Sequence, residues 1–159
     1  MNAALSEIVP RLFLGGVVDA SRGAGMYDAV VNCTPDFPFY GDPRSRLRVP
    51  VLDNDLNNAS LAPAMMRDAV AFVRGHLAEG RTVLVHCVAG QQRSPAVVAA
   101  FLVDHFRLSV DEAIEFVRKR RSCAFFESVN FRPSLDAFVR EPFFLREGEG
   151  SEEWRNSTR

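Results

Sequence analysis

The chain has 159 residues, of which 47% are hydrophobic and 25% are charged, and its formal net charge is −1. This length and composition fit a globular domain with a sizeable core, and the nearly balanced charge gives no reason to expect general affinity for nucleic acid or membranes. No stretch approaches the roughly 18 apolar residues of a membrane span, and no charged start precedes the apolar segment of a secretory signal.

Three short apolar runs early in the chain predict β-strands, at residues 11–14, 29–32 and 47–51. Asp53 and Asp55 follow the third run closely. Because aspartate is common in turns, we expect a loop that carries two carboxylates after the third strand.

A long helix is predicted next, from Ser60 to about residue 79. Serine is a favoured N-cap, and apolar residues between Met65 and Leu77 recur at helical spacing. Gly80 is expected to end this helix.

A fourth strand is predicted at residues 82–86, and the chain then reads His-Cys-Val-Ala-Gly-Gln-Gln-Arg-Ser over residues 86–94. Cys87 and Arg93 are six positions apart, with a glycine between them and a helix expected from about Ser94. Backbone N–H groups of such a loop and the helix N-terminus bind anions, and an arginine fork binds two phosphate oxygens together. We interpret the loop as a phosphate cradle.

This cradle predicts the chemical state of Cys87. A free thiol titrates near about 8.5, and helix N-termini and cations lower that to roughly 3.5–7.5, so we expect a nucleophilic thiolate. Ser94 is expected to hydrogen-bond the sulfur, His86 to hold the loop, and Gly90 to permit an unusual backbone angle or a close approach. The alternative is that Cys87 is one more buried small apolar residue.

Three further helices are predicted after the loop. Residues 96–105 are nearly all apolar, as expected for a helix at the centre of an α/β fold. Residues 109–112 form a capping-box sequence before a helix that ends in basic residues 118–121. The last helix is expected to begin near Pro133.

The sequence HCVAGQQRSP resembles the signature of the cysteine-dependent protein tyrosine phosphatases, in particular their dual-specificity branch. The resemblance extends over about residues 8–140. It implies an α/β fold with a single central sheet, mixed but mostly parallel, flanked by helices. Further segments that resemble this branch are residues 8–15, 28–32, 48–54 and 109–121.

The resemblance implies a cysteine-dependent phosphoric monoester hydrolase that forms a phosphocysteine intermediate and needs no metal or other cofactor. Arg93 and the loop amides then carry the charge on phosphate. The loop positions expected to bind substrate are Val88, Ala89, Gly90, Gln91, Gln92 and Arg93. Either glutamine amide could orient the attacking water, or both could face outward.

A general acid is needed to protonate the departing oxygen, which typically contributes about 10²–10⁴-fold. In the family the acid follows a Val-Pro-Val type of segment, which favours Asp53. The loop is slightly longer here, so Asp55 stays open as the acid, and one of the two aspartates is expected to be a turn former.

The substrate implied by the resemblance is a phosphorylated protein. The chain lacks the tyrosine-recognition loop of the larger phosphatases, so we expect it to accept phosphotyrosine and also phosphoserine and phosphothreonine. Alternatives are a phosphatase for nucleotide or RNA 5′-phosphates or for phosphoinositides, a rhodanese-like sulfurtransferase, and a non-catalytic phosphoprotein-binding module. The uncharged loop residues argue against a highly anionic lipid headgroup.

Two residues outside the loop carry hypotheses. Arg121, together with Arg118, is predicted to form a secondary basic site for a second substrate phosphate, the alternative being a solvated helix end. Cys33 is hypothesised to form a disulfide with oxidised Cys87, the alternative being a buried small residue.

We expect a catalytic domain over residues 1–146 and a frayed polar tail over residues 147–159. Trp154 is expected to be disordered or in a crystal contact within this tail, the alternative being that it docks on the domain. Three scattered cysteines form no disulfide framework, and a thiolate enzyme needs reducing conditions, so the cytoplasm is the expected location. No nucleic-acid or membrane partner is expected, and a monomer is the default.

Overall fold

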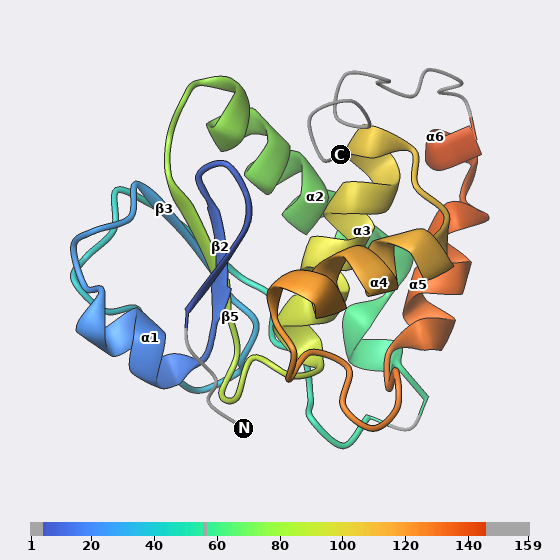
Figure 1. Ribbon diagram of the computed structural model, residues 1–159, viewed down its shortest axis with the longest axis horizontal. Helices are drawn as coiled ribbons and strands as arrows, with labels where there is room; N and C mark the ends of the chain where they lie inside the picture. Colours follow the sequence, from blue (N-terminus) through green and yellow to red (C-terminus); the bar gives the residue numbers. More distant parts are fainter. Residues whose placement is uncertain (1–4, 56, 146–159) are drawn as a thin grey trace.

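The computed structural model describes residues 5–55 and 57–145, which form one mixed sheet with helices on both faces (Figure 1). In this part of the chain the sheet has the strand order β1-β2-β5-β3-β4. Strand β1 is antiparallel to β2, and every other neighbouring pair is parallel, which confirms the expected fold class. The strands are β1 (Ser6–Val9), β2 (Leu12–Gly15), β3 (Ala29–Asn32), β4 (Ser45–Arg48) and β5 (Val83–His86).

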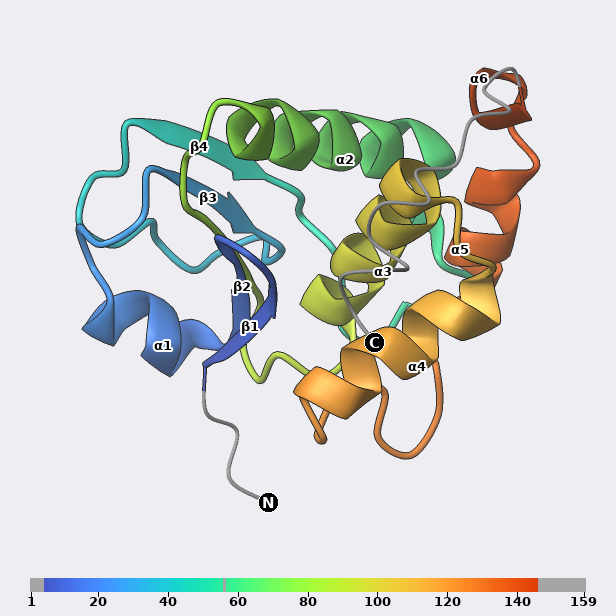
Figure 2. The same cartoon turned by 45° about the horizontal axis from the view of Figure 1, so that its top comes forward.

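The helices divide unequally between the two faces of the sheet. Helix α1 lies on one face and the remaining helices on the other, as Figures 1 and 2 show. The helices are α1 (Val17–Arg22), α2 (Pro63–Ala78), α3 (Arg93–Phe106), α4 (Val110–Arg120), α5 (Arg132–Val139) and α6 (Pro142–Leu145).

The side chains of central strand β5 pack alternately into two hydrophobic clusters, one on each face of the sheet. Val83 and Val85 belong to the large core shared with α2 and α3, whereas Leu84 belongs to a smaller cluster with Ala20 of α1. Successive side chains of a strand point to opposite faces, so a strand buried on both faces is apolar throughout.

Helix α3 runs through the centre of the large core. Its residues from Ala96 to Val103 are at most 1% exposed, which confirms the expectation of a central apolar helix. The helix begins at Arg93, directly after the cysteine loop. Its N-terminal end, which carries partial positive charge, therefore adjoins that loop.

Several predicted boundaries differ from the structure. Residues 49–51 were predicted as strand but follow β4, because Pro50 has no backbone N–H for the ladder and the Val51 N–H donates instead to the Val49 carbonyl. Val49 and Val51 are buried all the same. Strand β1 and helix α1 were not predicted as separate elements, and each is short.

The predicted N-cap at Ser60 is wrong. Helix α2 begins at Pro63, whose missing N–H costs little in a first turn, and Ser60 lies in a short 3₁₀ helix, Ala59–Leu61. The capping box of α4 is confirmed, since Ser109 and Glu112 exchange side-chain to backbone hydrogen bonds of 2.9 and 3.0 Å.

Residues 147–159, including Trp154, lie outside the described residues. Within residues 5–55 and 57–145, no helix combines the length and the apolar character needed to cross a membrane.

Candidate active site

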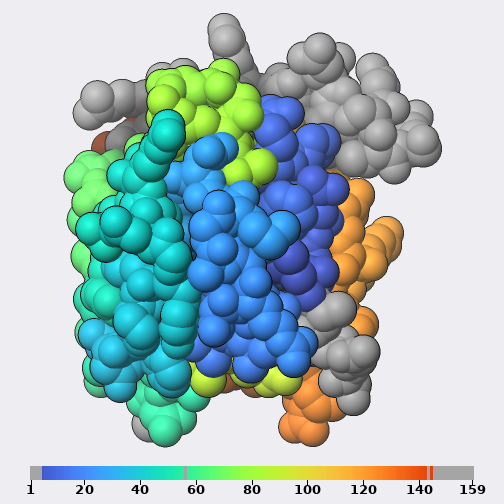
Figure 3. Space-filling view, turned by 90° about the vertical axis from the view of Figure 1, so that its left-hand side faces the viewer, coloured from blue at the N-terminus to red at the C-terminus, as the bar shows by residue number. Residues whose placement is uncertain are grey.

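The cysteine loop lies at the carboxyl ends of the parallel strands, the edge where α/β sheets bind ligands. It leaves β5 at His86 and enters α3 at Arg93. In Figure 1 it occupies the lower edge of the molecule, near the segments that follow β4 and α4. The space-filling view in Figure 3 shows parts of the same segments gathered at the lower edge.

The sulfur of Cys87 lies at the base of this loop and is contacted by hydrogen-bonding groups. The residue is 2% exposed. Its Sγ accepts a hydrogen bond of 3.2 Å from the Gly90 N–H and lies 3.1 Å from the Ser94 hydroxyl. Donors that converge on a sulfur stabilise its anionic form, so this environment suits a thiolate.

Gly90 shapes the loop for two reasons, both anticipated from the sequence. Its φ of +66° lies in the left-handed region, which favours glycine. A Cβ at this position would also lie 2.5 Å from Arg121 Nη2 and 2.7 Å from the Gly15 carbonyl oxygen. The loop can therefore turn back under the sulfur only with glycine here.

Arg93 connects the loop with the segment that follows β4. The residue is 7% exposed, and its Nη1 donates to the Val51 carbonyl at 3.2 Å. Its Nε lies 3.6 Å from Oδ1 of Asp53. One guanidinium thus adjoins both the cysteine loop and one of the two candidate acids.

The structure separates the two aspartates that the sequence left open. The Asp53 side chain is 67% exposed and faces Arg93. The Asp55 carboxylate instead accepts hydrogen bonds from Ser60, 2.6 Å from the backbone N–H and 2.5 Å from the hydroxyl. These bonds lower the pKa of Asp55 and fix it as the anchor of a turn.

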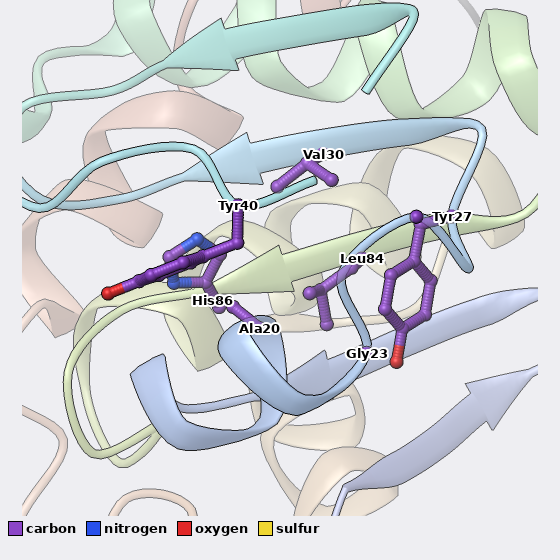
Figure 4. Close-up of a pocket in the computed structure, with 8 residues that line it drawn as sticks. Ala20, Gly23, Tyr27, Val30, Tyr40, Leu84 and His86 are labelled. Carbon is purple, nitrogen blue, oxygen red and sulfur yellow. The ribbon is translucent and has the colours of Figure 1, made fainter. Parts of the chain in front are cut away.

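His86 is fully buried behind the loop. Its Nδ1 lies 3.2 Å from the Cys87 carbonyl, and burial lowers the pKa of its imidazole. Its Nε2 has no hydrogen-bond partner among the described residues. The ring borders a cavity of about 10 Å³ beside Tyr40 (Figure 4), which is close to the volume that one water needs. A neutral His86 that supports the loop agrees with the sequence expectation.

Arg121 does not form the predicted secondary basic site. Its residue is 2% exposed, and its Nε and Nη2 donate to the carbonyls of Gly90 and Ala89 at 2.8 and 3.2 Å. A guanidinium buried against the loop backbone is unable to reach a second phosphate, so that prediction is wrong. Because Arg121 binds the outward carbonyls, it holds the loop in its curled form.

A signal for this role was present in the sequence. The buried residues of α4 are Val110, Ala113, Ile114 and Val117. Arg121 follows Val117 by four positions and therefore continues the buried stripe of the helix. Arg118 follows the buried Ile114 by the same spacing, but its side chain is 36% exposed and binds Glu115 and the Phe125 carbonyl.

The two glutamines of the loop bind the segment after α4. The Gln92 amide donates to the carbonyls of Phe126 and Ser128 at 3.1 and 2.7 Å and accepts from the Asn130 N–H at 3.0 Å. This amide is therefore engaged in holding a neighbouring loop, not in orienting water. The Gln91 carbonyl accepts from the Phe125 N–H at 2.7 Å.

Cys33 is buried beside the loop, and its N–H donates to the His86 carbonyl at 2.8 Å. Burial, together with the negative charge of a Cys87 thiolate, raises the pKa of its thiol well above the usual value. Cys33 therefore stays protonated under conditions in which a thiolate nucleophile works.

Comparison with known proteins agrees with this geometry. The family model described as the catalytic domain of dual specificity phosphatases matches residues 12–141. Dual specificity protein phosphatase 2 of Homo sapiens is 35% identical over 120 residues, which cover 72% of this chain and 37% of that protein. The chain thus spans little more than a third of the length of this relative.

Solved structures share the fold. Human DUSP28 superimposes with a TM-score of 0.74 at 27% identity, and the match covers 87% of this chain and 94% of that one. A mouse putative dual specificity phosphatase, crystallised in complex with zinc tungstate, superimposes with a TM-score of 0.70 at 28% identity, with 87% of each chain covered.

Proposed function

The chain belongs to the dual specificity phosphatases, and from this membership we propose that it hydrolyses phosphotyrosine, and also phosphoserine and phosphothreonine, in proteins. The observation that carries the proposal is the environment of the Cys87 sulfur. It accepts a hydrogen bond from the Gly90 N–H and lies beside the Ser94 hydroxyl at the start of α3. A tetrahedral oxyanion is the ligand that such a loop, helix end and arginine suit together. The tungstate with which the mouse relative was crystallised is an anion of this kind.

In the first chemical step the Cys87 thiolate attacks phosphorus. A sulfur–phosphorus bond forms as the ester oxygen–phosphorus bond breaks. Arg93 and the backbone N–H groups of residues 88–93 stabilise the equatorial oxygens, and Asp53 gives its proton to the departing oxygen. We assign this proton to Asp53 because it lies beside Arg93, whereas Asp55 is bound by Ser60.

In the second step water attacks the phosphocysteine. Asp53, now a carboxylate, takes a proton from the water as the oxygen–phosphorus bond forms. The sulfur–phosphorus bond breaks, and the sulfur leaves as a thiolate that the Ser94 hydroxyl stabilises at 3.1 Å. The products are the dephosphorylated residue and inorganic phosphate, and the enzyme returns to its starting state.

The loop composition supports a protein substrate. The side chains of Val88, Ala89, Gln91 and Gln92, which lie in the loop between Cys87 and Arg93, are uncharged. A highly anionic headgroup such as a phosphoinositide would find fewer cations here than it requires. A reducing compartment such as the cytoplasm is proposed for the chain because its nucleophile is a thiolate, and residues 1–146 are proposed as the catalytic domain.

Trapping of the intermediate tests the proposal. Wild-type protein is mixed with ³²P-labelled phosphopeptides and quenched within milliseconds, and the label is expected on Cys87 when the protein is digested. A panel of phosphotyrosine, phosphoserine and phosphothreonine peptides, a nucleoside 5′-monophosphate and thiosulfate then ranks the substrates. Label on another residue, or turnover of thiosulfate alone, would contradict the proposal.

A further inference from the structure

Several exposed large apolar residues belong to the segments that form and adjoin the cradle. Among the described residues, those with the greatest exposure are Leu5, Val18, Met26, Leu52, Val88 and Phe126. Single exposed apolar residues are ordinary on a protein surface, whereas a cluster marks a binding surface. Four of these residues adjoin the cysteine loop, and we call Val18, Leu52, Val88 and Phe126 the apolar rim.

Three of the rim residues come from the loop itself, from helix α1 and from the segment after β4. Val88 follows the nucleophile, and its carbonyl accepts from the N–H of Val17, the neighbour of Val18, at 2.9 Å. Leu52 lies between Val51, which accepts from Arg93, and Asp53, which faces Arg93. These rim residues therefore lie on, or next to, the segments that supply the groups proposed to bind phosphate and protonate the leaving oxygen.

Phe126 completes the rim from the segment after α4. Its side chain is 55% exposed, and its carbonyl accepts from Gln92 of the cysteine loop at 3.1 Å. The neighbouring Phe125 is buried, and its N–H donates to Gln91. These two hydrogen bonds, together with those of Gln92 to Ser128 and Asn130, hold this segment against the loop.

A groove of about 540 Å³ runs beside Phe126. Its lining includes Ser122 and the buried residues Ala124 and Phe125, and its exposed apolar residue is Phe126. Its charged residues are Arg118, which is bound to Glu115 and the Phe125 carbonyl, and the exposed Glu127. The groove has room for a large side chain, which would meet the exposed Phe126.

We propose that the apolar rim and this groove select phosphorylated protein segments with a large apolar residue next to the phosphorylated residue, and that Phe126 is a specificity-determining residue. The proposal rests on the proposed phosphatase function. Acidic neighbours are disfavoured because Glu127 is exposed at this surface and Arg118 is already bound to Glu115, and because the guanidinium of Arg121 is buried against the loop and does not meet a second phosphate.

The test compares two phosphotyrosine peptides that differ only in the residues flanking the phosphotyrosine, leucine in one and glutamate in the other. The measured quantity is the ratio of kcat/KM for the leucine peptide to that for the glutamate peptide. One methylene group in a hydrophobic pocket is worth about 10–200-fold, so we expect a ratio of about ten or more for the wild type. Phe126→Ser is expected to lower the ratio at least about threefold, and Leu52→Ser to lower it in the same direction.

Met26→Ser is the matched control. Met26 is 72% exposed but lies outside the apolar rim, so the ratio is expected to stay at the wild-type value. Because both peptides are measured on the same protein, a partial loss of folded enzyme cancels in the ratio.

A wild-type ratio of one or less would overturn the specificity proposal. The same holds if Phe126→Ser and Leu52→Ser show the same ratio as Met26→Ser. In both cases Cys87-dependent turnover would still support the phosphatase function. Faster turnover of phosphoinositide in phosphatidylcholine vesicles than of either peptide would also overturn it, since the rim would then face a lipid. Absence of Cys87-dependent turnover of all substrates would instead overturn the proposed function and, with it, this inference.

Discussion

The segments that supply the proposed nucleophile and the proposed acid are held in different ways. Cys87 is 2% exposed, and the loop around it is fixed by a left-handed glycine and by Arg121 on its outward carbonyls. The Asp53 side chain is 67% exposed and meets Arg93 at 3.6 Å. The loop proposed to bind phosphate is thus held in shape by its own contacts, whereas the proposed acid, which would have to meet leaving oxygens on different amino acids, stands at the surface.

The largest loss of activity is expected when the nucleophile in the cysteine loop is replaced. Cys87→Ser should lower kcat on an aryl phosphate at least about 10⁴-fold, because loss of a nucleophile removes the covalent route. Cys123→Ser is the matched control, since Cys123 is also 2% exposed but lies outside the loop. Equal kcat values for the two variants would show that Cys87 has no special role.

The next effect distinguishes the exposed acid from its neighbour. Asp53→Asn should lower kcat about 10²–10⁴-fold for substrates with poor leaving groups, because the departing oxygen loses its proton donor. The matching change Asp55→Asn should lower it far less, since Asp55 is bound by Ser60. The comparison measures kcat on a phosphoserine peptide and on an aryl phosphate. A larger loss of kcat in Asp55→Asn than in Asp53→Asn would assign the acid to Asp55 instead.

A smaller loss of activity and of stability is expected when Arg121, which supports the cysteine loop, is replaced. Arg121→Leu should lower the free energy of unfolding by about 2–4 kcal/mol, because buried loop carbonyls lose charged donors. It should also lower kcat about 10–100-fold as the loop loses its geometry. Denaturant unfolding and kcat measure both effects.

Arg120→Leu is the control for Arg121, because it makes the same change at an exposed neighbouring position of α4. If the Arg121 variant fails to fold, Arg121→Lys keeps the charge and one donor group and should show an intermediate loss of kcat. Full activity in both Arg121 variants would mean that the loop holds its shape without this residue.

The smallest effect concerns the turn that follows the acid. The pKa of Asp55 is lowered in the folded protein by hydrogen bonds from Ser60, so its carboxylate stabilises the fold above the unfolded pKa of about 3.9. That stability is lost as pH falls through the lower folded value. The Tm of the wild type should therefore exceed that of Asp55→Asn at pH 6, and the difference should shrink toward pH 3. A difference that does not change with pH would contradict this role.

The cysteine loop could be predicted from the sequence because its chemistry is contiguous. Cys87, Gly90, Arg93 and Ser94 follow one another within eight positions, and a strand and an apolar helix flank them. The sheet and the central helix were predictable for a similar reason, since periodicity and burial are local properties of a segment.

The remaining features depend on contacts between distant segments. Ser60 resembles a helix cap in sequence, but its hydroxyl is used by Asp55 and Leu52, and this contact decides which aspartate faces Arg93. Arg121 resembles a solvated helix end by charge, yet the loop carbonyls that it binds are 31 and 32 positions away. The position of the exposed Phe126 beside the loop likewise depends on a distant contact, the hydrogen bond from Gln92 to its carbonyl.

The most direct test of the account is the crystal structure of the protein soaked in vanadate. The account predicts vanadium bonded to Cys87 Sγ, with its equatorial oxygens on the N–H groups of residues 88–93 and on the Arg93 guanidinium, and Asp53 beside the apical oxygen. Vanadate bound elsewhere, or a loop that stays empty at saturating vanadate while Cys87 resists alkylation at neutral pH, would contradict it.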